Sequence, residues 1–135
     1  MNQPAPFAAS VLVALGGAAG AVLRHQVGRG LTWWLGASAV TTFPWATFTV
    51  NLLGSLAMGL LAGGFARLGT AGESWRLLIG VGLLGGFTTF SAFSLELMML
   101  IERGQAAVAL TYAAVSVIAG LTALYVGLIV MWIAG

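Results

Sequence analysis

The residues best suited to chemistry in this chain lie in one run, 85–94, which reads GGFTTFSAFS. Adjacent glycines loosen a helix, and threonine and serine hydroxyls can bond to the backbone groups that a loosened helix leaves free. Within a membrane, irregular backbone is tolerated only where it is buried in protein or lines a water-filled path. The run therefore predicts a broken membrane helix at a functional site.

Such a break offers groups of both polarities at one place. The second half of the helix directs its N-terminal dipole at the break, and the freed carbonyls near Gly85 and Thr88 can coordinate a cation such as Na⁺. Phe90 and Phe93 are three residues apart, so they are neighbours on a helix that begins after the break. Two phenylalanines at this spacing usually form core packing, but their positive ring edges can also face an anion. These residues indicate a pathway for a small ion, with a preference for anions.

Further polar side chains lie inside apolar segments. Asn51 has Thr47 and Ser55 four residues to either side, so the three share one helix face. An amide in hydrocarbon is costly unless it is paired. Asn51 either joins two helices or presents its two N–H donors to an anion pathway. Tyr112 and Ser116 repeat the same spacing and add hydroxyl donors.

Two charged residues have more than one possible role. Arg24 ends the first apolar segment, where it either reaches the lipid headgroups or concentrates anions at a pore mouth. Glu96 either pairs with Arg24, lines a vestibule or carries a proton. Nothing in the sequence resembles a nucleophile–base pair, paired catalytic carboxylates, a metal-ligand cluster or a phosphate-binding loop, so we do not expect an enzyme.

The composition identifies the elements that position these groups. Of the 135 residues, 60% are hydrophobic and 6% are charged, whereas soluble domains carry roughly 25% charged residues. We therefore predict a single-domain, all-α integral membrane protein, and no basic patch suggests nucleic-acid binding. Four apolar stretches reach the roughly 20 residues that a membrane-spanning helix needs. They cover residues 7–27, 44–66, 75–101 and 105–133.

Small residues recur in three of these stretches, at four-residue spacing in the first two, which is typical of close helix packing in membranes. Trp33 and Trp34, between the first two stretches, predict a short helix at the membrane interface. The small residues are Gly16 and Gly20, then Ser55, Gly59 and Gly63, and finally Ser116, Gly120 and Gly127.

The arginine count leaves the orientation in the membrane almost undecided. Four spans place both termini and the second connection on one side, with Arg67 and Arg76. The opposite side holds Arg24, Arg29 and Arg103. Orientation normally follows the side richer in Lys and Arg. Either one orientation wins by a small margin, or the chain inserts both ways and opposite copies pair as an antiparallel dimer.

Three segments together resemble the Fluc (CrcB) family of fluoride channels. They are GAAGAVLR at residues 17–24, TFTVNLLGS at 47–55 and, most specifically, GGFTTFSAFSLE at 85–96. The resemblance implies a dual-topology, antiparallel homodimer in the inner membrane of a bacterium, with two fluoride pores and a central Na⁺. It further implies passive export of cytoplasmic fluoride.

The same resemblance assigns roles to individual positions. Asn51, Phe90 and Phe93 would line the pore, and Arg24 would help to form the vestibule, with Glu96 along the path. Family members often carry a second hydroxyl one turn after Ser116, where this chain has Gly120. Further polar contacts would come from Thr47, Ser91, Tyr112 and Ser116, and the Na⁺ would be held by the carbonyls of Gly85 and Thr88.

Two other functions fit the same size and composition. One is a coupled transporter, either of the small four-helix multidrug type or a proton-coupled fluoride exporter that uses Glu96. Small multidrug exporters carry a glutamate in the middle of the first span, and this chain has none there. The other is a helical subunit that supports a larger complex.

Overall fold

The computed structural model describes residues 4–68 and 72–134, and every regular element in them is a helix. Four of the described segments are long and apolar enough to cross a membrane, which confirms the predicted all-α, four-span architecture. Residues 69–71 of the predicted second connection lie outside the described residues. The spans are α1 (Pro6–Leu35), α3 (Trp45–Leu68), a third composite segment (Glu73–Glu102) and α7 (Ala106–Ile133).

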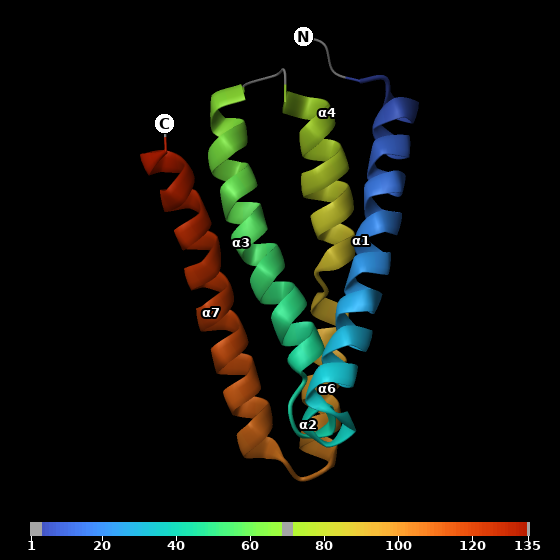
Figure 1. Cartoon of the computed structure of the whole chain (residues 1–135), viewed down its shortest axis with the longest axis vertical. Coiled ribbons are helices and arrows are strands. Elements are labelled where there is room, and N and C mark those ends of the chain that lie inside the picture. The colour runs from blue at the N-terminus through green and yellow to red at the C-terminus, as the bar shows by residue number, and fades with distance from the viewer. Residues whose placement is uncertain (1–3, 69–71, 135) are drawn as a thin grey trace.

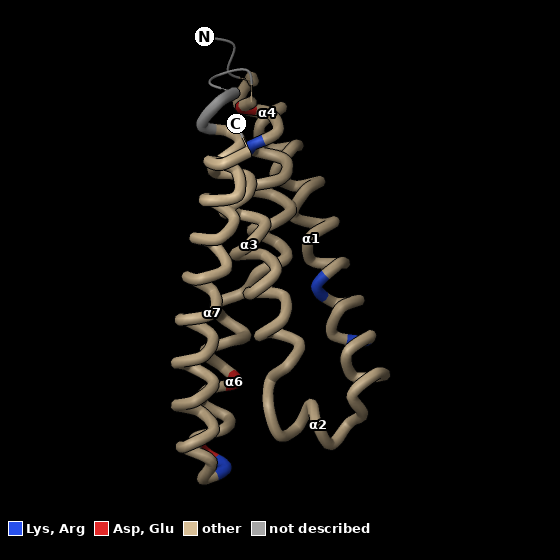
Figure 2. The backbone as a smooth tube through the Cα atoms, turned by 60° about the vertical axis from the view of Figure 1, so that its left-hand side comes forward, with Lys and Arg blue, Asp and Glu red and all other residues tan. Residues whose placement is uncertain are grey.

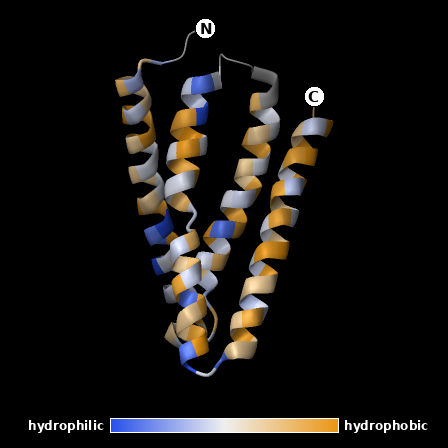
Figure 3. Cartoon of the chain, turned by 180° about the vertical axis from the view of Figure 1, so that it is seen from behind, coloured by the Kyte–Doolittle hydropathy of each residue, from blue (hydrophilic) through white to orange (hydrophobic). Residues whose placement is uncertain are grey.

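The chain runs up and down along one long axis. The starts of α1 and α4 (Glu73–Trp75) and the end of α7 lie at one end, and the short helix α2 (Ala37–Thr42) and the connection between α6 (Phe90–Glu102) and α7 lie at the other (Figure 1). The backbone is uncharged over long stretches, and two basic positions lie on the lower half of α1 (Figure 2). Apolar residues extend along all the long helices (Figure 3). Many large apolar side chains are exposed, as expected where the solvent is lipid.

The first helix is longer than the sequence predicted. It continues past Val27 to Leu35, so the prediction of a separate helix at Trp33 and Trp34 is wrong: both lie in the last turn of α1. A glycine inside a helix costs only about 1 kcal/mol, which explains why the glycines near residue 29 do not end it. The helix ends instead at Gly36, whose φ of 82° glycine adopts readily.

The third span is assembled from several short elements. It starts with α4 (Glu73–Trp75), a π-helix η2 (Arg76–Leu84) and α5 (Gly85–Phe87), and it ends with α6 (Phe90–Glu102). Between α5 and α6 the backbone is extended: Thr88 has φ −83° and ψ 158°, and Thr89 has φ −154° and ψ 123°. The hydroxyl of Thr89 accepts a hydrogen bond of 3.2 Å from the backbone N–H of Ala92. Thr89 thus caps the start of α6.

Glycines allow the helices to pack backbone against backbone in two places. α1 packs on η2 and α5, where a Cβ added to Gly16 would lie 2.8 Å from the nitrogen of Leu83. α3 packs on α7, where a Cβ added to Gly127 would lie 2.7 Å from the nitrogen of Leu60. Both distances are too short for a side chain, so the predicted close packing at these small residues is confirmed.

Candidate functional site

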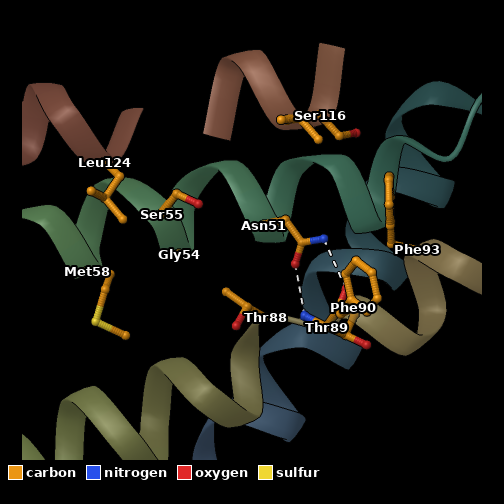
Figure 4. A pocket seen from close by; sticks show the side chains of 11 residues that line it. Asn51, Gly54, Ser55, Met58, Thr88, Thr89, Phe90, Phe93, Ser116 and Leu124 are labelled. Atoms are coloured by element: carbon orange, nitrogen blue, oxygen red, sulfur yellow. Dashed lines mark hydrogen bonds between the residues drawn. The ribbon is translucent and has the colours of Figure 1, made fainter. Parts of the chain in front are cut away.

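A cavity of about 350 Å³ lies where α3, α7 and the extended residues between α5 and α6 meet (Figure 4). Six residues that the sequence singled out, from three separate segments, line this one cavity. They are Asn51, Ser55, Thr88, Phe90, Phe93 and Ser116. The remaining lining is Gly54, Met58, Thr89, Val117 and Leu124.

Asn51 holds the extended backbone of Thr89 in place. Its Nδ2 donates to the Thr89 carbonyl at 3.1 Å, and its Oδ1 accepts from the Thr89 N–H at 2.8 Å. The side-chain amide therefore pairs with the backbone as a neighbouring strand would, and both bonds are drawn in Figure 4. This corrects the expectation that both N–H donors of Asn51 face a pathway, because one is used for Thr89 and one remains. Asn51 both joins two elements and lines the cavity.

The same bonds affect the carbonyls of Gly85 and Thr88. In a continuous helix the N–H of residue i+4 would donate to each of them. The N–H of Thr89 is instead donated to Asn51, and that of Ala92 to the Thr89 hydroxyl. Because the backbone is extended here, the two N–H groups that would donate to these carbonyls in a helix donate elsewhere.

Two aromatic rings border the cavity on the α6 side. The centroids of Phe90 and Phe93 are 5.8 Å apart and the rings are tilted by 38°. Phe93 also packs on Tyr112, with centroids 5.1 Å apart. Phe90, by contrast, is 79% exposed in the single chain. The ring pair therefore has one member fixed in the core and one at the surface.

Ser116 contributes an available donor. Its Oγ is buried and has no hydrogen-bond partner among the described residues. Buried polar atoms normally have a partner, so an orphaned hydroxyl in a cavity marks a place for a ligand or water. One turn farther along α7, a Cβ added to Gly120 would lie 3.5 Å from the Ser55 hydroxyl.

A second polar group lies nearer the other end of α6, around Glu96. Thr47 Oγ1 donates to Glu96 Oε1 at 2.6 Å, and the Tyr112 hydroxyl donates to Oε2 at 2.8 Å. Tyr112 is fully buried and Thr47 is 7% exposed. Two hydroxyls directed at one carboxylate form a site that suits a negative charge.

The other predicted site residues, Arg24, Ser91 and Gly85, do not belong to the cavity lining or to the hydrogen bonds of Glu96. Arg24 does not pair with Glu96, since the ion pair found in the described part of the chain joins Arg76 to Glu73 at 2.7 Å. Ser91 is exposed, and its hydroxyl lies 3.2 Å from that of Thr89. Gly85 is exposed, with no atom within 4 Å of an added Cβ.

Two contributors were missed by the sequence analysis. The backbone of Thr89 is the partner of Asn51, although residue 89 was considered only as part of the run. Phe43 packs on Tyr112 with ring centroids 5.3 Å apart. The proline that follows Phe43 predicts only an extended backbone at residue 43, so the sequence carried no signal for this ring contact.

Comparisons with known proteins agree on one family. The profile of the family described as "CrcB-like protein, Camphor Resistance (CrcB)" matches residues 11–128. A protein of Erythrobacter litoralis named "Fluoride-specific ion channel FluC" is 56% identical over 129 residues, or 95% of each chain. Proteins with the same name from Novosphingobium aromaticivorans and Caulobacter vibrioides are 57% and 47% identical, over 91% and 89% of this chain and 95% and 92% of theirs.

Proposed function

This chain belongs to the CrcB-like family, and on that premise we propose that it is a fluoride-selective ion channel in the inner membrane of a bacterium. Fluoride would leave the cytoplasm by passive electrodiffusion. Hydrogen fluoride enters acidified cells as the neutral acid and dissociates, so the trapped anion needs its own route out. The observation that carries the proposal is the cavity itself, where donors without other partners meet aromatic rings inside a membrane span.

The donors supply what a small anion loses when it sheds water. The free N–H of Asn51 and the unpaired hydroxyl of Ser116 both belong to the cavity lining. The rings of Phe90 and Phe93 add positive edges. Selectivity over chloride follows if these groups fit an ion of fluoride's size, because a larger ion is less well compensated for its lost hydration. Thr47 and Tyr112 would line the continuation of the track toward Glu96, to which both hydroxyls donate.

We further propose that the channel is an antiparallel, dual-topology homodimer with two pores. The support comes from the open side of the cavity. Phe90 is 79% exposed and Gly85 is exposed in one chain, next to the extended backbone of Thr88 and Thr89. Irregular backbone facing lipid would be costly, so a second copy is needed to cover it.

A sodium ion at the centre of this dimer would be held by the carbonyls of Gly85 and Thr88 from both subunits. Carbonyl oxygens of unwound membrane helices are suitable ligands for Na⁺. These two carbonyls fit the role because their helical donors are used by Asn51 and by the Thr89 hydroxyl. The ion would supply positive charge between the two pores.

Flux measurements on the purified protein test the function. Proteoliposomes that contain only this chain should release fluoride rapidly down its gradient and retain chloride. Absence of fluoride flux would overturn the channel and favour a subunit of a larger complex, and equal chloride flux would overturn a fluoride-selective channel. Glu96→Gln separates a channel from a proton-coupled exporter: passive efflux continues in a channel, and coupled transport stops.

Labelling tests the dual topology. The chain contains no cysteine, so Ser74→Cys, an exposed position beside the predicted second connection, introduces a single thiol. In sealed vesicles an impermeant reagent should label about half of the protein from outside and the rest only after permeabilisation. Labelling entirely from one side would refute dual insertion.

A further inference from the structure

A second cavity, of about 200 Å³, lies at the end of the molecule that holds α2. It is formed between α2, the start of α3 and the last turns of α6. Its lining includes Thr41, Pro44, Met99 and Leu100, and two charged residues, Glu96 and Arg103. In the sequence, Arg103 bears only on the orientation of the chain in the membrane, and the function proposed above gives it no role.

Glu96 connects this cavity to the buried hydroxyls. The same carboxylate accepts hydrogen bonds from Thr47 and Tyr112 and also lines the cavity. The cavity therefore reaches the polar track from the side away from Phe90 and Ser116. An ion that follows the track in this direction arrives here.

The negative charge around this cavity opposes the entry of an anion. Glu96 contributes a carboxylate, and α6 ends at Glu102 with the negative pole of its helix dipole. Both repel fluoride. A channel that opens here needs a compensating positive charge at the mouth.

Arg103 is placed to provide that charge. It follows the last residue of α6 and lies seven residues beyond Glu96, or two helical turns of about 10 Å in all. Its guanidinium forms no ion pair within the described ranges 4–68 and 72–134, so it is not neutralised by Glu96. Its charge remains available to the cavity.

We propose that this cavity is the water-filled entrance to the anion pathway at this end of the molecule, and that Arg103 attracts fluoride into it by offsetting the charge of Glu96. This inference rests on the proposed channel function. A charge that acts through water raises the local anion concentration and therefore the rate of entry, and salt screens its effect. A purely structural role for Arg103 would not depend on salt.

The test places charges of opposite sign at one position of the same folded protein. Arg103→Cys introduces the sole thiol in the chain, and this thiol is modified in detergent with a quaternary-ammonium or a sulfonate methanethiosulfonate, with the yield read by mass. Fluoride efflux is then compared at ionic strengths of about 0.01 M and 1 M, where the Debye lengths are about 30 Å and 3 Å. Sucrose balances the osmolarity at low salt, and potassium gluconate supplies the high salt.

We expect faster efflux from the positive adduct at low salt. One unit charge about 10 Å away in water changes the local anion concentration about twofold, so the two adducts should differ about fourfold. The difference should vanish at 1 M. Arg29→Cys is the matched control, because Arg29 is exposed on α1 and outside the cavity lining; its two adducts should conduct equally.

Three results at position 103 would overturn the inference. They are equal efflux from both adducts at position 103 at low salt, a difference that survives high salt, and failure of the thiol introduced by Arg103→Cys to react. An equal response at position 29 would assign the effect to overall surface charge and would also overturn it. The wild-type chain separates failure of this inference from failure of the proposed function. If the wild-type chain shows no fluoride efflux, the proposed channel function is wrong. If it shows efflux but the charge at position 103 has no effect, only the role of this cavity and Arg103 as the entrance is wrong.

Discussion

Replacing Asn51 with alanine tests the contact on which the site depends. The substitution removes both bonds to Thr89, of 3.1 and 2.8 Å, and leaves a backbone donor and an acceptor without their partner. Thr89 is only 9% exposed, so bulk solvent does not replace the amide freely. The extended residues 88–89 would then lose their attachment to α3.

The loss of stability can be bounded from two sides. Hydrogen bonds between membrane helices average about 0.6 kcal/mol, so two give a lower bound of ~1 kcal/mol. A buried group left without a partner costs about 1–3 kcal/mol, so two give an upper bound of ~6 kcal/mol. The adjoining cavity of about 350 Å³ has room for water beside Thr89, which moves the cost toward the lower bound. We expect Asn51→Ala to destabilise the protein by about 2 kcal/mol.

Reversible unfolding in mixed micelles measures this free energy, and fluoride efflux from proteoliposomes measures the functional effect. Thr111→Ala is the control, because the exposed Thr111 hydroxyl donates only to Ala107 of its own helix. We expect the control to change stability by less than ~0.5 kcal/mol and to leave efflux unchanged. Efflux through Asn51→Ala should fall at least about tenfold, which equals 1.4 kcal/mol. If the two variants are equally stable, the role of Asn51 in holding Thr89 is wrong; if Asn51→Ala conducts normally, its role in the pathway is wrong.

Three further substitutions probe the packing and the polar track. Gly20→Ala should destabilise by about 1–3 kcal/mol, because the added Cβ would lie 2.7 Å from the nitrogen of Phe87, whereas Gly30→Ala, with no atom within 4 Å, should be neutral or stabilising in a thermal melt. Ser116→Ala removes a hydroxyl without a partner among the described residues, so we expect unchanged stability but slower efflux; normal efflux would exclude Ser116 from the track. Tyr112→Phe keeps the buried ring and loses the 2.8 Å bond to Glu96, at a cost of about 1.5–3 kcal/mol in unfolding experiments; a loss below ~0.5 kcal/mol would show that this bond contributes little.

The four spans could be predicted because hydrocarbon imposes a simple rule of length and polarity. The shared face of Thr47 and Asn51 followed from helical periodicity, and both side chains do point toward the third span, where they meet Glu96 and Thr89. The end of α1 could not be predicted in the same way. Glycines near residue 29 are typical of a loop, yet isolated glycines cost a helix too little to end it.

The detailed geometry of the third span also could not be predicted from the sequence. A π-helix over Arg76–Leu84 has no distinctive composition, and its glycines are equally suited to an α-helix packed closely on a neighbour. The pairing of Asn51 with Thr89 depends on two elements 38 residues apart. Periodicity describes one helix at a time, so it cannot identify which backbone group receives a side chain from another element.

The contact between Asn51 and Thr89 restricts which residues evolution can place at position 51 much more than at position 89. Asn51 binds only the main chain of residue 89, so this contact places no demand on the side chain there. What restricts position 89 is its cap on α6, a role that serine, aspartate and asparagine also perform. Position 51 has no such substitutes, because among the neutral side chains with a one-carbon stem only asparagine carries an N–H donor and a carbonyl acceptor on two separate atoms side by side, as the two bonds to Thr89 require. We therefore expect a small set of residues to be tolerated at position 89 and only asparagine at position 51.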